Sequence, residues 1–149
     1  PKTPFLKISA SYLDGYKAAG QVTVSGPRAI EKARLAAEIV WKRLERAGVT
    51  FAAEDRMTEL LGVSGVLPGI LAAPDDPPEV VLRLAVRGAD RAKVDRFGKE
   101  IAPLVTAGPP GVTGFAGGRP KAQEVVAYWP PLLAREEIET TLEVSAEAI

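Results

Sequence analysis

The stretch of residues 27–47 constrains the fold most, because strong helix formers combine there with an apolar stripe along one side. Pro27 suits the first turn of a helix, and Gly48 is placed to cap its end. The apolar residues recur at three- and four-residue steps: Ile30, Ala33, Ala37, Val40, Trp41 and Leu44. Charged residues fill the other faces, so we expect an amphipathic helix that lies on a sheet.

Strand-like segments flank this helix on both sides. Residues 5–13 and 21–24 are expected to form two strands of a hairpin, with Asp14-Gly15 as its turn. Residues 57–63 predict a third strand, and residues 79–87 predict a fourth because apolar side chains alternate along them. The loop at residues 66–73 is apolar, so we expect it to be covered by another part of the molecule or by a partner.

A second amphipathic helix is expected after Asp90, which suits its N-cap, and Pro103 should bend or shorten its last turns. Its inward stripe comprises Val94, Phe97, Ile101 and Leu104. Residues 121–130 predict a fifth strand, and a helical turn at 134–139 and a strand at 140–144 follow. The order ββαββαβ predicts an α+β fold, with a single mixed or mainly antiparallel sheet and both helices packed on one face. The length of 149 residues fits one domain, residues 1–149.

Composition excludes several classes of function. Nineteen basic and nineteen acidic residues cancel, which argues against nucleic acid or an anionic membrane as a partner. The chain has no cysteine and no histidine, so no metal site is predicted, and any catalysis within it depends on carboxylates, lysine, tyrosine, hydroxyls or backbone dipoles. No apolar run approaches the roughly 20 residues that span a bilayer, and we expect a cytoplasmic protein. Asparagine is absent and only Gln21 and Gln123 represent glutamine, a thermophile-like composition.

The run GPPGVTGFAGGRPK, residues 108–121, is the main candidate for a ligand site. It does not fit a nucleotide P-loop, because it leads from a helix into a strand and Lys121 is followed by alanine. Its glycines can let the backbone approach a ligand while a cation meets an anionic group. The residues concerned are Gly111, Gly114, Gly117, Gly118, Arg119 and Lys121. Alternatively the run is only a connection, with Gly108 as a helix cap.

Asp14 and Tyr16 are weak candidates for catalytic groups, since a carboxylate and a phenol lie close together in sequence. In the alternative interpretation, Asp14 only caps the backbone of its own turn. The acidic pairs Glu54-Asp55 and Asp75-Asp76 are interpreted as solvated loop charges without metal geometry.

Several segments resemble the acyclic terpene utilisation family of the AtuA type. They are SYLDGYKAAGQVTVSGP, AIEKARLAAEIVWKRLERAG, LRLAVRGADRAKVDRFGKEIAPLVTAGPPG and VVAYWPPLLARE, and together they span most of the chain in order. The most specific pieces are Asp14-Gly15-Tyr16, Ser25-Gly26-Pro27, ARLAAEI at residues 33–39, Ala89-Asp90-Arg91 and Gly108-Pro109.

This resemblance implies a role in the bacterial catabolism of acyclic terpenes such as citronellol and geraniol, which proceeds through coenzyme A thioesters. It also implies that the chain corresponds to the C-terminal half of a larger family domain with a preceding α/β portion. Two departures stand out. Residues 17–20 replace a glycine-flanked glutamate of the family, and residues 65–69 replace a Ser-Leu-His-Gly-like segment.

Two functional hypotheses follow. In the first, the chain is part of a catabolic enzyme or binding protein for acyl or acyl-CoA compounds, and Asp14 and the glycine-rich run face the ligand. In the second, it is an interaction or oligomerisation module whose apolar and glycine-rich loops are covered by another chain, a missing N-terminal half or a second copy. The sequence names no cofactor and leaves open whether the chain is an enzyme.

Overall fold

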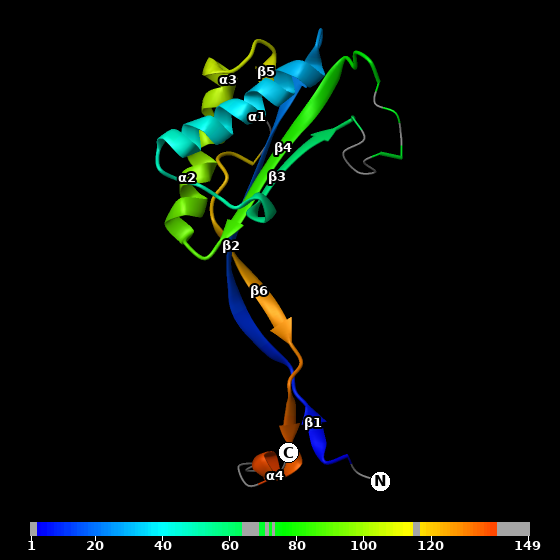
Figure 1. Ribbon diagram of the computed structural model, residues 1–149, viewed down its shortest axis with the longest axis vertical. Helices are drawn as coiled ribbons and strands as arrows, with labels where there is room; N and C mark the ends of the chain where they lie inside the picture. Colours follow the sequence, from blue (N-terminus) through cyan, green and yellow to red (C-terminus); the bar gives the residue numbers. More distant parts are fainter. Residues whose placement is uncertain (1–2, 64–68, 71, 73, 115–116, 140–149) are drawn as a thin grey trace, which may run out of the picture. The chain divides into compact units, whose positions relative to one another are not determined.

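A computed structural model describes residues 3–63, 69–70, 72, 74–114 and 117–139 of the protein (Figure 1). The contacts within the chain group it into two compact units. The larger unit comprises residues 15–125, and the smaller unit comprises residues 1–14 together with residues 126–149.

The larger unit is built on an antiparallel sheet with the strand order β3-β4-β2-β5. Its strands are β2 (Ala10–Ser25), whose first residues belong to the smaller unit, β3 (Arg56–Leu61), β4 (Glu79–Gly88) and β5 (Val112–Thr113). A further strand, β6 (Gln123–Trp129), also pairs with β2.

The helices connect strands that are not neighbours in the sheet. Helix α1 (Ala29–Arg46) joins β2 to β3, and β4 lies between these two strands. Helices α2 (Arg91–Ile101) and α3 (Pro103–Ala107) join β4 to β5, and β2 lies between them. Two such split βαβ units form the ferredoxin-like arrangement. The predicted α+β class and the mainly antiparallel sheet are therefore confirmed.

The hydrophobic core lies between the helices and one face of the sheet (Figure 1). Alternate residues of β2 and β4 are buried there, among them Val22, Val24, Leu82 and Leu84. Helix α1 contributes mostly small side chains to this layer: Ala29, Ala33, Ala36, Ala37, Val40 and Leu44. Because alanine adds little width, this helix packs close to the sheet. None of the described helices has the length and apolar surface that crossing a membrane requires.

The ends of the two predicted helices are explained by single residues. The Asp90 carboxylate accepts hydrogen bonds from the backbone N–H groups of Ala92 at 2.8 Å and Lys93 at 3.3 Å, so the predicted N-cap is confirmed. Pro103 separates α2 from the short α3, as expected for a residue that cannot donate a backbone hydrogen bond.

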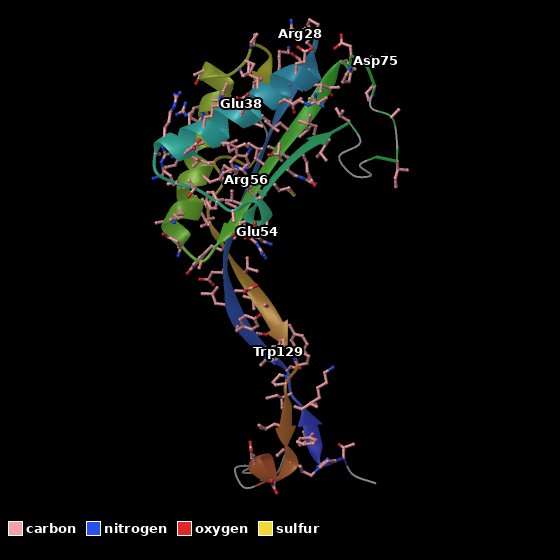
Figure 2. The ribbon with its side chains drawn as sticks, in the orientation of Figure 1. Arg28, Glu38, Glu54, Arg56, Asp75 and Trp129 are labelled. Atoms are coloured by element: carbon pink, nitrogen blue, oxygen red, sulfur yellow. The ribbon has the colours of Figure 1, made fainter. Side chains whose placement is uncertain are left out.

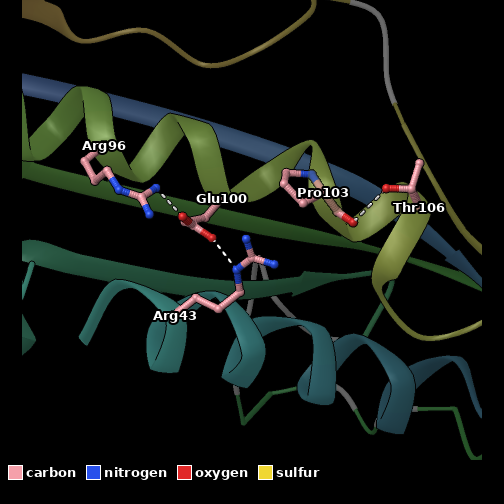
Figure 3. Close-up of polar contacts among 5 residues, drawn as sticks. All are labelled: Arg43, Arg96, Glu100, Pro103 and Thr106. Carbon is pink, nitrogen blue, oxygen red and sulfur yellow. Dashed lines mark hydrogen bonds and ion pairs between the residues drawn. The ribbon is translucent and has the colours of Figure 1, made fainter. Parts of the chain in front are cut away.

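A buried carboxylate connects α1 to α2 (Figure 3). The side chain of Glu100 is 1% exposed and accepts a hydrogen bond from Arg43 Nε at 2.5 Å. It also pairs with Arg96, one turn earlier on α2. Both arginines reach solvent with part of their side chains, so the paired carboxylate is buried while the opposing charges remain partly hydrated.

The predicted hairpin turn at Asp14-Gly15 is wrong, because β2 continues through both residues. Gly15 has a φ of +86°, and a Cβ at this position would lie 2.8 Å from the carbonyl oxygen of Gly88. The glycine therefore permits a close approach of β2 to the end of β4. From the sequence alone, a glycine needed for such an approach cannot be distinguished from one in a turn that reverses the chain. The pairing of β2 with β4 then runs without interruption from Tyr16 to Ser25.

The smaller unit contains a two-stranded antiparallel sheet of β1 (Phe5–Lys7) and β7 (Leu132–Ala134). β1 lies within the strand predicted at residues 5–13, whereas β7 and its pairing with β1 were not predicted. The N–H of Ile8 donates to the carbonyl of Pro131 at 3.1 Å and extends this pairing. Helix α4 (Arg135–Glu139) confirms the predicted helical turn. The predicted strand at residues 140–144 and most of the apolar loop at residues 66–73 lie outside the described residues.

Candidate functional site

The described part of the glycine-rich run owes its path to three glycines with positive φ. These are Gly111 at +88°, Gly117 at +122° and Gly118 at +71°, conformations that other residues rarely adopt. The run begins where the N–H of Gly108 donates to Leu104 at the end of α3. It then adds β5 to the edge of β2.

The last part of the run is fixed on the larger unit by Pro120. A Cβ on Gly98 of α2 would overlap the carbonyl oxygen of Pro120, and a Cβ on Gly20 of β2 would lie 2.7 Å from its ring. The neighbouring N–H of Ala122 donates to the Asp95 carboxylate at 2.8 Å. These contacts hold the backbone on either side of Pro120 against both β2 and α2. They therefore determine the positions from which the side chains of Arg119 and Lys121 extend.

A hollow of about 410 Å³ lies beside this fixed segment. Its lining comprises Ala19, Gly117, Gly118, Arg119, Pro120, Lys121 and Gln123. Among the described residues, the lining includes two cationic side chains and no carboxylate. Neither Arg119 nor Lys121 forms an ion pair or side-chain hydrogen bond within the described part of the chain. Two cations beside exposed glycine backbone make this hollow suited to an anionic group.

A second, smaller hollow of about 190 Å³ shares the residues Gly118, Arg119 and Pro120 with the first. The rest of its lining is mostly apolar: Val22, Ile101, Ala102, Val105 and Gly114. A cationic hollow and an apolar hollow therefore meet at the same three residues. This arrangement suits a ligand that has an anionic part and a short hydrocarbon part.

The predicted ligand residues are thus only partly brought together. Gly117, Gly118, Arg119 and Lys121 line one hollow, and Gly114 lies in the adjoining apolar one. Gly111 lines a separate hollow of about 630 Å³ at the start of α1.

Local contacts explain the position of Gly111. Its carbonyl accepts a hydrogen bond from the N–H of Ser25 at 3.0 Å, and a Cβ added to it would lie 3.3 Å from Lys32 Nζ.

Asp14 and Tyr16 do not line the hollow of residues 117–121. Asp14 is exposed, whereas Tyr16 is half-buried and the Arg91 guanidinium lies 5.8 Å from the centre of its ring. Within the residues described, no cluster of three Asp or Glu side chains is placed to hold a metal ion.

Two of the acidic residues interpreted as solvated have structural partners. Asp76 accepts a hydrogen bond from the N–H of Arg28 at 2.9 Å, and Figure 2 shows its neighbour Asp75 at the same end of the unit as Arg28. Asp55 pairs with Arg87 at 2.8 Å. These carboxylates fix loops to a helix start and to a strand, so they are not simply solvated charges.

A larger hollow of about 610 Å³ lies between α1 and β3 but is less suited to an anion. Figure 2 labels two of its lining residues, Glu38 and Arg56. Two carboxylates, Glu38 and Glu45, line it, and two of its three cations already have partners: Lys42 pairs with Glu38 at 2.5 Å, and the Arg56 guanidinium lies 5.6 Å from the centre of the Trp41 ring. The larger volume therefore does not make this hollow the better anion site, because carboxylates line it, whereas no carboxylate among the described residues lines the hollow of Arg119 and Lys121.

The sequence interpretation missed the residues that support the site: Gly20, Gly98 and Asp95. Gly98 could have been recognised, because glycine inside an otherwise favourable helix lowers helix stability and usually marks a close approach.

Comparison with known proteins identifies one family. Residues 1–144 match the model of the acyclic terpene utilisation family protein AtuA. No curated protein and no solved structure matches the chain. Since the match covers nearly all of the chain and agrees with the resemblance carried by the sequence motifs, the chain belongs to the acyclic terpene utilisation family AtuA.

Proposed function

We propose that the unit of residues 15–125 binds an anionic acyl compound, of the class of acyl-CoA intermediates in the degradation of acyclic terpenes or branched chains. Membership of the AtuA family supports the general area of terpene utilisation. The observation that carries the proposal is the junction of two hollows at Gly118, Arg119 and Pro120. In an acyl-CoA the pantetheine arm separates the acyl group from the phosphates. The pyrophosphate therefore lies against Arg119 and Lys121, and the dimethyl part of the arm next to it enters the apolar hollow.

The role proposed for this unit is binding and orientation of the ligand. Arg119 supplies a planar pair of donors that suits a phosphate or carboxylate, and Lys121 supplies a point charge beside it. Gly117 and Gly118 leave the backbone open to a bulky anion, since neither has a side chain. A reaction would require further groups, because neither Asp14 nor Tyr16 lines this hollow.

The test is calorimetric titration of the protein with coenzyme A and with a branched five-carbon acyl-CoA. Because both cations are exposed, each of Arg119→Ala and Lys121→Ala is expected to weaken binding by about three- to tenfold, equal to about 0.7–1.4 kcal/mol. Binding should also weaken as salt increases. Lys93→Ala, an exposed cation on α2 outside the hollow, is the matched control and should bind like the parent.

Unchanged affinity in both site variants would contradict the proposal. The second candidate function, a non-catalytic interaction or oligomerisation module, is favoured by the exposed apolar side chains of the smaller unit. It predicts no binding of either coenzyme A compound.

A further inference from the structure

Exposed apolar side chains concentrate in the smaller unit. Seven of the eleven exposed large hydrophobic residues found among the described residues belong to it: Phe5, Tyr12, Leu13, Val126, Tyr128, Trp129 and Leu132. Trp129 is 62% exposed (Figure 2), and Leu132 is 66% exposed. We call residues 3–14 and 126–134 the exposed ribbon.

The stability and the apolar surface of the exposed ribbon indicate that another molecule covers it. It consists of paired strand segments, and a two-stranded ribbon is marginally stable alone. Its seven side chains together expose on the order of 700 Å² of mostly apolar surface, if a large side chain offers about 200 Å² and is a little more than half exposed. This area is divided between both faces of the ribbon, because neighbours along a strand, such as Tyr12 and Leu13, point to opposite faces. The part on each face is thus about the size of the largest apolar patch of a typical monomer, about 300–600 Å², and such patches are often functional.

The ribbon also has a free backbone edge. Strand β4 pairs with β2 only from Tyr16 onward, and β5 pairs with it only at Thr23 and Val24. Along residues 10–14, β2 therefore has at most β6 as a neighbour, and its other edge carries no strand of the described chain. This edge, with the sequence ASYLD, lacks the lysine and proline that commonly protect exposed edges.

We propose that a second copy of this chain covers the exposed ribbon, with residues 10–14 of the two copies paired as antiparallel strands about a two-fold axis. A two-fold axis places identical edges opposite each other in antiparallel orientation, so the free edge is complementary to itself.

One register of the two paired strands places compatible side chains opposite each other along this edge. With Tyr12 on the axis, the two tyrosines form an aromatic cross-strand pair, and Asp14 lies opposite the partner's Ala10 rather than opposite another carboxylate. Contact of the two copies would also bring part of each Tyr12 side chain out of water.

The first measurement is the mass of the full chain in solution by light scattering. The expected result is twice the 15.8 kDa of one chain. Because the chain has no cysteine, Tyr12→Cys introduces its only thiol. Residues opposite each other in antiparallel strands have Cα atoms about 4.5–5.5 Å apart, within the range of a disulfide. Mild oxidation should therefore give a covalent dimer of this variant.

The control is Ala92→Cys, an exposed position on α2 in the larger unit, which should remain uncrosslinked under the same conditions. A second variant, Tyr12→Lys with Leu132→Lys, places like charges at the interface and should halve the measured mass while helical circular dichroism is retained. Should this variant fail to fold, the disulfide result decides.

Three results would overturn the proposal. They are a monomeric parent chain, a dimer that survives both lysine substitutions, and equal crosslinking at Tyr12 and Ala92. Copurification of a different protein with a monomeric parent would assign the ribbon to that partner and also overturn it. None of these results bears on the ligand hollow, because coenzyme A binding is measured separately with Arg119→Ala.

Discussion

The substitution Gly98→Ala tests whether α2 supports the candidate site. In an exposed helix this change stabilises by about 1 kcal/mol, because alanine has the higher helix propensity. Here the added Cβ would overlap the carbonyl oxygen of Pro120 and lie 2.9 Å from its carbonyl carbon. These are backbone atoms that no rotamer change can move, and forced overlap in a packed region costs about 1–3 kcal/mol.

The two effects have opposite signs, and the clash is expected to dominate. We expect Gly98→Ala to lower the free energy of unfolding by up to about 2 kcal/mol, and the midpoint of thermal unfolding by up to about 8 °C. Affinity for coenzyme A should fall as well, since Pro120 fixes the backbone of Arg119. Circular dichroism during heating measures the change in stability, and calorimetric titration measures the change in affinity.

Gly114→Ala is the matched control, because its nearest neighbour beyond the adjacent residues is Val105 Cγ2 at 3.8 Å, an ordinary contact distance. Its stability should stay within about 0.5 kcal/mol of the parent. An unfolding midpoint of Gly98→Ala at or above that of the parent would mean that helix propensity dominates. It would refute the close packing of Pro120 on α2.

Two further predictions concern the buried carboxylate and the apolar hollow. Replacing both Arg43 and Arg96 by alanine leaves Glu100 buried without a partner and should destabilise by about 3–5 kcal/mol, more than the sum of the single changes; additive effects in urea unfolding would show that the two ion pairs act independently. Gly114→Val should reduce ligand binding more than stability, because its side chain would fill the hollow beside Val105; equal losses in calorimetry and thermal unfolding would contradict this.

The sequence predicted the helices well because their signals are local. The apolar stripes, the Asp90 cap and the stop at Pro103 each depend on residues within one or two turns. The path of β2 was mispredicted, because Asp14-Gly15 is a turn signal by composition and only the partner β4 reveals it as part of a strand. Strand β7 was missed because Pro130-Pro131 indicates an end to regular structure.

The candidate site was predictable only where its residues are neighbours in sequence. Arg119 and Lys121 line one hollow with Gly117 and Gly118, close to them along the chain. Gly111 was grouped with them by sequence distance, yet β5 intervenes and its carbonyl is bound to Ser25. The supporting contacts of Pro120 come from β2 and α2, and long-range packing of this kind leaves no local pattern.

The packing of Pro120 against Gly20 and Gly98 has a consequence for the divergence of related chains. These three positions are far apart along the chain but depend on one another sterically. Gly20 leaves space for the ring of Pro120, and Gly98 leaves space for its carbonyl group. A mutation that enlarges either glycine displaces the cationic segment, so it should persist only together with a change at the proline position. Pairwise covariation among these three positions would therefore be an evolutionary signature of the intact ligand hollow.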